Sequence, residues 1–132
     1  MKTNPVVHFE MSAEDRGRMR KFYEGAFGWK THQLGKDMGM YVLVTTTDTD
    51  EKQMVTKPGT INGGFYQRMK GPESNAPSVV IEVEDIRESM RKVEKAGGKI
   101  IGKPMEIPGV GTYVSFFDTE GNRASMMQPN RK

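Results

Sequence analysis

The sequence has 132 residues and a mass of about 14.9 kDa, which is the size of a single compact domain. The 20 basic and 17 acidic residues give a net charge of +3 and are mixed along the chain without a long basic run, which argues against dedicated nucleic-acid binding. The sequence contains no cysteine, so disulfide scaffolds, thiolate metal sites and cysteine nucleophiles are excluded.

The first half of the chain predicts a strand, a helix and three further strands. Residues 6–11 predict a strand with one buried face, because apolar and polar side chains alternate from Val7 to Met11. Ser12 is the expected N-cap of a helix that runs to about Ala26, because the carboxylate of Asp15 can reach back to the Ser12 amide. The apolar stripe of this helix is Met19, Phe22, Tyr23 and Ala26. Further strands are expected over residues 29–34, 40–46 and 61–69, with a polar loop over 47–58.

The same order of elements restarts after residues 70–75, which contain glycine, proline, serine and asparagine and form the predicted linker. Residues 78–83 predict a strand, and Asp85 is the expected cap of a second helix. The apolar stripe of that helix is Ile86, Met90 and Val93. The remaining strands are expected over 99–103, 112–117 and 123–128.

An internal repeat explains this restart. A shift of 70 residues aligns residues 14–39 with residues 84–109 without a gap. The matched pairs include Asp15 with Asp85, Glu24 with Glu94, Ala26 with Ala96 and Gly28 with Gly98. We therefore expect an α+β fold in which two βαβββ modules, residues 5–70 and 76–129, make up one domain over residues 1–132.

A trough between the two modules follows from this arrangement, because a single helix can cover only one face of each sheet. In the first strand the helix takes Val7, Phe9 and Met11, so His8 and Glu10 should face the trough. By the 70-residue shift, Ser78 stands where His8 stands, and Val80 where Glu10 stands.

Several short motifs resemble those of a known family. They are His8-Phe-Glu, Phe22-Tyr, Phe27-Gly-Trp, Val83-Glu-Asp-Ile, Ala96-Gly-Gly-Lys, Ile107-Pro-Gly-Val-Gly and Phe117-Asp-Thr-Glu-Gly-Asn. This pattern is similar to the vicinal oxygen chelate superfamily, the glyoxalase/bleomycin-resistance/dioxygenase group, over about residues 5–128. The resemblance implies a glyoxalase-like half-barrel trough. It does not fix an activity, because the superfamily includes isomerases, dioxygenases, thiol transferases and metal-free binders.

The resemblance also implies four metal-ligand positions, one on the first strand and one on the last strand of each module. Here they fall on His8, on a position within 61–65 where Asn62 alone has a donor oxygen, on Ser78 and on Ser125. Only one of these side chains is an ordinary metal ligand, and a catalytic divalent ion takes about three imidazole or carboxylate ligands. We therefore expect no metal and no cofactor at this position. A cluster of His8, Glu10 and Glu82 is the alternative by which an ion could still be held.

Two glycines, at positions 63 and 64, follow Asn62, and their presence allows two structural interpretations. They would allow a ligand or the backbone to approach closely, or they mark a β-bulge.

Three functional hypotheses remain. In the first, the chain is a metal-independent small-molecule binder of the glyoxalase-like or bleomycin-resistance-like group; its expected ligand-binding residues are His8, Glu10, Asn62, Ser78, Ser125 and Met127. In the second, it is a lyase or isomerase that uses His8 and Glu10 as a catalytic acid–base pair on a small carbonyl compound. In the third, it is a paired-module interaction protein with a vestigial trough. An isoelectric point near 9.2 argues against the strongly acidic cleft that would hold a cationic drug.

The expected partners are an unidentified small molecule and a second copy of the chain. The resemblance implies a homodimer, and exposed edge strands of two small half-barrels favour self-association. No stretch approaches the ~20 apolar residues of a membrane span. Residues 1–10 lack the apolar core of a secretory signal, so we expect a cytoplasmic protein that binds neither membrane nor nucleic acid.

Overall fold

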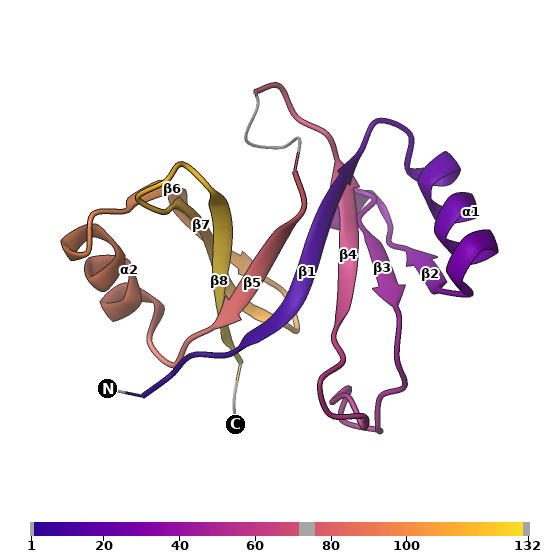
Figure 1. The fold of residues 1–132 in the computed structure, drawn as a ribbon, viewed down its shortest axis with the longest axis horizontal. Helices are drawn as coiled ribbons and strands as arrows, with labels where there is room; N and C mark the ends of the chain where they lie inside the picture. Colours follow the sequence, from indigo (N-terminus) through magenta and orange to yellow (C-terminus); the bar gives the residue numbers. More distant parts are fainter. Residues whose placement is uncertain (1, 72–75, 131–132) are drawn as a thin grey trace. The chain divides into compact units, whose positions relative to one another are not determined.

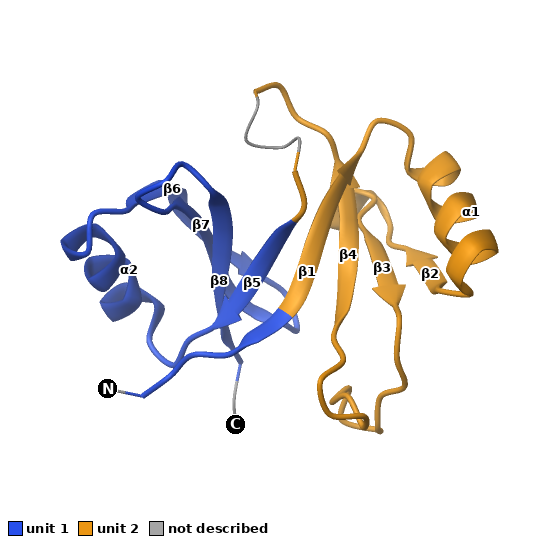
Figure 2. Ribbon diagram, viewed as in Figure 1, with its two compact units in different colours: residues 1–7, 78–132 blue, residues 8–77 orange. Residues whose placement is uncertain are grey.

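A computed structural model of the chain describes residues 2–71 and 76–130. It divides into two compact units: unit 1 is residues 1–7 with 78–132, and unit 2 is residues 8–77 (Figure 1, Figure 2). Most of the predicted linker, residues 72–75, lies outside the described residues. Among the described helices, none has the length and apolar character needed to span a bilayer.

Unit 2 contains a four-stranded sheet and one long helix. Its elements are β1 (Val6–Ala13, whose first two residues belong to unit 1), α1 (Arg16–Phe27), β2 (Lys30–Gln33), the short 3-10 helix η1 (Lys36–Met38), β3 (Val42–Thr45) and β4 (Asn62–Gln67). β2 pairs with β3 and β3 with β4 in antiparallel fashion, whereas β4 pairs with β1 in parallel. The strand order in this unit is therefore β2-β3-β4-β1.

Unit 1 repeats the same plan. Its elements are β5 (Ser78–Glu82), α2 (Ile86–Lys95), β6 (Lys99–Ile107), β7 (Gly111–Phe117) and β8 (Arg123–Pro129). β5 pairs with β8 in parallel, and β8–β7 and β7–β6 pair antiparallel. The predicted α+β class with two βαβββ modules is confirmed.

The helix caps show the repeat most directly. Asp15 and Asp85 are the two N-caps, and their carboxylates accept from the amides of Arg18 at 3.0 Å and Glu88 at 3.2 Å. The expectation that Ser12 caps α1 is wrong. Pairing with β4 continues to the end of β1, so Ser12 is a buried strand residue.

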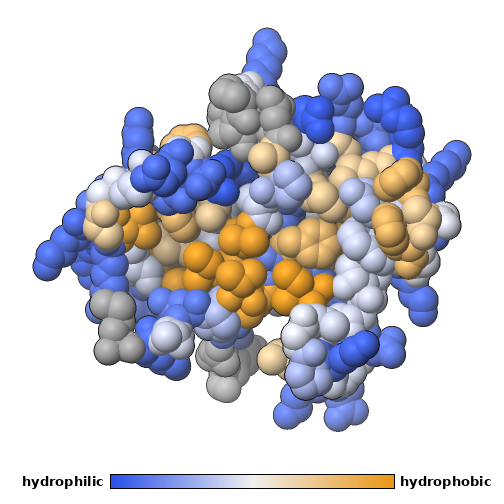
Figure 3. Space-filling view, viewed as in Figure 1, coloured by the Kyte–Doolittle hydropathy of each residue, from blue (hydrophilic) through white to orange (hydrophobic). Residues whose placement is uncertain are grey.

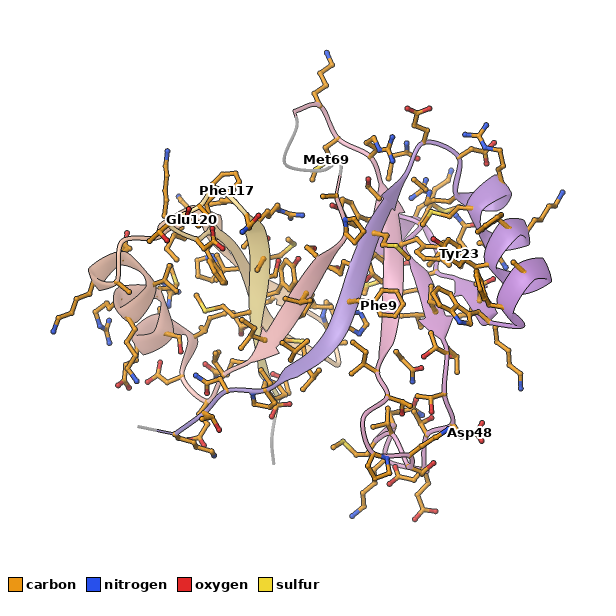
Figure 4. All side chains as sticks on the ribbon, viewed as in Figure 1. Phe9, Tyr23, Asp48, Met69, Phe117 and Glu120 are labelled. Atoms are coloured by element: carbon orange, nitrogen blue, oxygen red, sulfur yellow. The ribbon has the colours of Figure 1, made fainter. Side chains whose placement is uncertain are left out.

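Each sheet packs one face against its own helix. In unit 2 the fully buried Val42, Val44 and Phe65 pack with partly buried residues, and these are Phe9, Met11, Met19, Tyr23 and Trp29. Phe9 on β1 and Tyr23 on α1 both belong to this core (Figure 4). Val83, Ile86, Val114 and Met126 form the core of unit 1. The side chains that alternate with these core residues therefore lie on the opposite face of each sheet.

The predicted apolar stripe of α1 is only half buried. Met19 and Tyr23 contact the core, but Ala26 is exposed and Phe22 and Phe27 are 59% and 63% exposed. The Phe22 ring packs edge-on against Tyr23 with centroids 4.9 Å apart, so the aromatic residues contact one another more than the sheet. Figure 3 shows the resulting hydrophobic patch over α1 and a mainly hydrophilic surface over α2.

Candidate functional site

Tyr41 connects the two residues predicted as an acid–base pair. His8 and Glu10 lie on the face of β1 away from α1. The Tyr41 hydroxyl donates to Glu10 Oε2 at 3.0 Å, and His8 Nε2 lies 3.4 Å from the same hydroxyl. Glu10 is only 7% exposed, so a buried carboxylate is held by a phenol that also contacts the imidazole.

The direction of these hydrogen bonds determines which histidine nitrogen is basic. A phenol has one proton, and Tyr41 gives it to Glu10, so its oxygen can only accept from His8. The assignment consistent with both contacts places the His8 proton on Nε2 and leaves the lone pair on Nδ1.

Burial keeps His8 neutral. Desolvation lowers the pKa of the His8 imidazole below its usual value of 6.5, and the nearby Glu10 carboxylate offsets part of this effect. His8 is therefore a neutral imidazole at pH 7, which can accept a proton or a hydrogen bond from a ligand.

The paired glycines make room for two aromatic rings. A side chain at Gly63 would overlap the Phe9 ring, and one at Gly64 would overlap the Tyr41 phenol. The β1–β4 register runs through both glycines without a shift, so no bulge is present here. The close approach expected at these positions is made by the chain's own side chains.

A clamp of hydrogen bonds holds the turn before Tyr41. Arg16 Nη1 donates to the carbonyls of Gly39 at 2.9 Å and Met40 at 3.2 Å, and Gln33 Nε2 donates to Met40 at 3.1 Å. Met40 has a φ of 57°, the left-handed conformation that non-glycine residues rarely adopt. These contacts stabilise the strained residue that introduces Tyr41.

Asn62 lies opposite His8 in the register of β1 and β4, but its carbonyl oxygen supports a loop. Asn62 Oδ1 accepts from the amides of Thr46 at 2.7 Å and Thr47 at 3.0 Å. Asn62, which was predicted to bind ligand, thus stabilises the start of the loop after β3 in unit 2.

Ser125 belongs to a chain of hydroxyl groups in unit 1. Its Oγ lies 2.7 Å from the Tyr113 hydroxyl and 2.8 Å from Ser115 Oγ, and Arg123 Nη2 donates to Ser115 Oγ at 3.0 Å. Ser125 is fully buried and Ser115 is 6% exposed. All four side chains lie on the face of β7 and β8 away from α2.

Ser78 and Met127 lie on the same face of unit 1. Val80 pairs with Ser125 and Glu82 with Met127, and Ser78 has the parity of Val80. Met127 is half-buried opposite Tyr113. Among the described residues, Ser78 Oγ is the one buried side-chain polar atom without a hydrogen-bond partner.

The side chains at the family's metal positions do not fit a catalytic divalent ion. His8 is an imidazole, but Asn62 is a neutral amide engaged by two backbone amides, and Ser125 is bonded to two other hydroxyls. The alternative cluster of His8, Glu10 and Glu82 finds no support, because no group of three potential His, Cys, Asp or Glu ligands occurs in the described part of the chain.

A separate hollow of about 600 Å³ opens in unit 2 beside the first turns of α1. Its lining includes Met11, Asp15, Arg18, Met19, Phe22 and Arg68. His8, Glu10 and Tyr41 do not line it, so this hollow is distinct from the polar cluster on β1.

The sequence predicts His8, Glu10 and Ser125 as site residues but not the side chains that contact them within each unit. The contact between Tyr41 and Glu10 could not be predicted from local spacing. Tyr41 lies just before β3, and its side chain reaches Glu10 across β4 by passing over Gly64. Tyr113, Ser115 and Arg123 have alternate positions in their strands, and only the β7–β8 register brings them together. The Gly63-Gly64 pair is the one sequence feature that indicates a large side chain packed over β4, which here is Tyr41.

Comparisons with known proteins agree with the fold. The model of the glyoxalase/bleomycin resistance protein/dioxygenase superfamily matches residues 6–126. A glyoxylase-like domain-containing protein of Didymella fabae is 29% identical over 120 residues, which cover 89% of this chain and 88% of that protein. A lactoylglutathione lyase of Oryza sativa subsp. japonica is 33% identical over 125 residues, which cover 89% of this chain and 42% of that protein. The chain therefore spans less than half the length of the rice relative.

Solved structures share the architecture at low sequence identity. A hypothetical protein of Bacillus halodurans C-125 superimposes with a TM-score of 0.69 at 13% identity, over 99% of this chain and 98% of that chain. Methylmalonyl-CoA epimerase of Mycobacterium tuberculosis gives a TM-score of 0.61 at 14% identity, over 96% and 88% of the two chains. These solved structures thus share the fold of this chain. The chain belongs to the glyoxalase/bleomycin resistance protein/dioxygenase superfamily.

Proposed function

We propose that this chain is a metal-independent small-molecule binding protein, and that His8, Glu10 and Tyr41 anchor its ligand. The observation that carries the proposal is the Tyr41 hydroxyl between the buried Glu10 carboxylate and the His8 imidazole. Buried polar clusters cost desolvation energy and are commonly retained for binding or catalysis. The cluster lies on the sheet face opposite α1, and its members His8 and Tyr41 are half-buried.

The ligand chemistry follows from the donors and acceptors of the cluster. A neutral His8 offers the lone pair of Nδ1, which accepts a hydrogen bond from a ligand hydroxyl or amide. A small organic molecule with a polar donor is therefore the class of ligand that fits.

A lyase or isomerase activity is the second candidate, and the lowered pKa of His8 favours it. A neutral imidazole can take a proton from the carbon next to a carbonyl group, and Glu10 would stabilise the imidazolium that forms. Tyr41 would hold both side chains in place. The rice relative is named as a lactoylglutathione lyase, and its name places it among the lyases.

S-lactoylglutathione is a suitable probe for separating the two candidates. Binding is measured by calorimetry, and turnover is followed with the same probe, with and without added nickel or zinc. Binding that is saturable without turnover supports the binding protein. Turnover that does not depend on metal and is lost in His8→Gln supports the enzyme.

The matched control for this experiment is His32→Gln, which changes an exposed histidine on β2. Both candidates predict that His32→Gln behaves as the wild type. Turnover that appears only with added metal and disappears in His8→Gln contradicts the metal-independent proposal.

A further inference from the structure

The turn between η1 and β3 contains two consecutive residues in the left-handed conformation. Gly39 has a φ of 64° and Met40 a φ of 57°. The Tyr41 amide donates to the Met38 carbonyl at 3.2 Å across them. This pattern is typical of a type I′ turn, whose two central positions favour glycine, asparagine or aspartate. A methionine at the second of these positions is strained, and a strained residue persists where its surroundings hold it in place.

Side chains from two elements hold Met40 in this conformation. Its carbonyl accepts hydrogen bonds from Arg16 Nη1, at the start of α1, and from Gln33 Nε2 on β2. The Gly39 carbonyl accepts from the same Arg16 nitrogen. Gln33 is itself oriented by Arg20 Nη1, which donates to its Oε1 at 3.4 Å. Two residues of α1 and one of β2 therefore act together on a single strained turn.

The repeat shows that the fold itself does not require this arrangement. Under the 70-residue shift, Arg16 corresponds to Ile86, and Met40 corresponds to Val110. Ile86 is the first residue of α2 and is buried in the core of unit 1. Val110, unlike Met40, does not have a positive φ. The arginine and the strained methionine therefore distinguish unit 2 from its repeat, which points to a local role.

Tyr41 connects this turn to the opposite face of the sheet. Its backbone follows Met40 directly, and its hydroxyl donates to Glu10 and lies 3.4 Å from His8 Nε2. α1 packs on the other face of the same sheet, where its first residue, Arg16, reaches the turn. The turn is thus the link between α1 and the cluster of His8, Glu10 and Tyr41.

We propose that Arg16 is a positioning residue for the ligand-anchoring cluster, because it fixes the turn that carries Tyr41. The Tyr41 hydroxyl is thereby kept between Glu10 and His8. Without the bonds from Arg16, Met40 relaxes towards a negative φ and Tyr41 turns away from the cluster. The inference rests on the proposed function for the purpose of the cluster, whereas the positioning itself is measured without a ligand.

The pKa of His8, followed by NMR titration of its ring in the full chain, reports the position of Tyr41. Burial lowers this pKa, the Glu10 carboxylate opposes the effect, and the Tyr41 phenol contacts the imidazole. Arg16→Ala should therefore raise the pKa of His8 towards 6.5, because the imidazole becomes more solvated. Gln33→Met removes the second donor to the turn and should shift the pKa in the same direction. A wild-type pKa in both variants would overturn the proposal.

The double variant Arg16→Ala/Met40→Gly tests whether the effect passes through the turn. Glycine adopts the left-handed conformation without strain, so it does not need the arginine to hold it there. The pKa of His8 should return to the wild-type value in this variant. A merely structural role of Arg16 would not give this rescue. A pKa that stays raised in the double variant would therefore contradict the positioning role.

Arg18→Ala is the matched control, because it removes the same charge from an exposed residue of α1. Arg18 lines the hollow beside the helix, so its loss should leave the turn and the pKa of His8 unchanged. An equal rise of the pKa in Arg18→Ala and Arg16→Ala would show a general effect of charge and overturn the proposal.

Binding of S-lactoylglutathione separates this inference from the proposed function. Arg16→Ala should weaken binding of this probe by about three- to tenfold, because one hydrogen-bonded anchor is displaced, and Met40→Gly in the same chain should restore it. Wild-type affinity in Arg16→Ala together with a raised pKa of His8 would support the positioning of Tyr41. The same result would contradict the proposal that Tyr41 anchors the ligand.

Discussion

The Tyr41 phenol lies over Gly64, on the face of the unit 2 sheet away from α1. It fills the space that a side chain at position 64 would need. Tyr41 can reach the buried Glu10 only because β4 has no side chain at this point. One glycine in one strand therefore determines the geometry of a cluster whose other members belong to β1 and to the residue preceding β3.

Gly64→Ala should displace Tyr41 and destabilise the protein. We expect the free energy of unfolding to fall by about 1–3 kcal/mol, the usual cost of forcing extra volume into a packed site. Denaturant unfolding measures this change. Gly25→Ala is the control, because a side chain at position 25 would contact nothing. Gly25 lies inside α1, so its replacement by alanine should raise the free energy of unfolding by about 0.5–1 kcal/mol. A Gly64→Ala protein as stable as the wild type would contradict the packing described for Tyr41.

Tyr41→Phe should separate the effect of the hydroxyl from that of the ring. The ring still fits over Gly64, but Glu10 loses its phenol donor inside a buried site. We expect a loss of about 1–3 kcal/mol in the free energy of unfolding, the cost of leaving a buried partner without that bond. Tyr23→Phe is the matched control, because the Tyr23 hydroxyl makes a weak contact with the Met11 sulfur at 4.0 Å. Its removal should change stability by less than about 0.5 kcal/mol.

His8 should make folding stability depend on pH in the range just below neutrality. Its folded-state pKa lies below 6.5, so as the pH falls through 6.5 the unfolded chain takes up the proton before the folded chain does. Stability therefore decreases with falling pH until the folded-state pKa is reached. NMR titration of the His8 ring measures that pKa directly.

Glu10→Gln tests the cause of the His8 shift. The Glu10 carboxylate raises the pKa of His8 against the larger effect of burial, so its removal should lower the pKa further. A higher pKa in Glu10→Gln would show that the carboxylate does not act on the imidazole as described.

The N-cap of α1 predicts a separate loss of stability in acid. The Arg18 amide that Asp15 accepts holds the pKa of the Asp15 carboxyl below its usual value of 3.8. The stability that this charged cap contributes is present above 3.8 and is lost as the pH falls through the folded-state pKa. Asp15→Asn keeps an oxygen that caps the helix but does not titrate, so its unfolding should depend less steeply on pH in this range. If unfolding of Asp15→Asn depended on pH as steeply as that of the wild type, the charged cap would not be the cause of the acid instability.

The repeat and the polarity of each strand could be predicted from the sequence because they depend on local spacing. Asp85 caps α2 as predicted, and Phe9 and Met11 pack on the helix side as predicted. The prediction for Ser12 is wrong because a serine hydroxyl favours a cap, whereas pairing with β4 extends the strand through Ser12. Local propensity gives way here to a sheet partner more than 50 residues away.

The chemistry of the sites was harder to predict, since it depends on contacts between strands. His8 and Glu10 could be placed on one face from alternation alone. Tyr41 joins them only through the β3–β4–β1 pairing and the gap over Gly64. Asn62 pairs with His8 across β1 and β4, yet its oxygen accepts from the backbone amides of Thr46 and Thr47. The sequence predicts the polar loop that begins there but not this contact.

Metal loading distinguishes a protein that binds its ligand without a metal ion from a metal-dependent one. The purified protein is saturated with nickel, zinc or manganese, desalted, and analysed for bound metal beside a His8→Gln sample. We expect much less than one ion per chain and no difference between the two proteins. One ion per wild-type chain that is absent from His8→Gln would contradict this expectation.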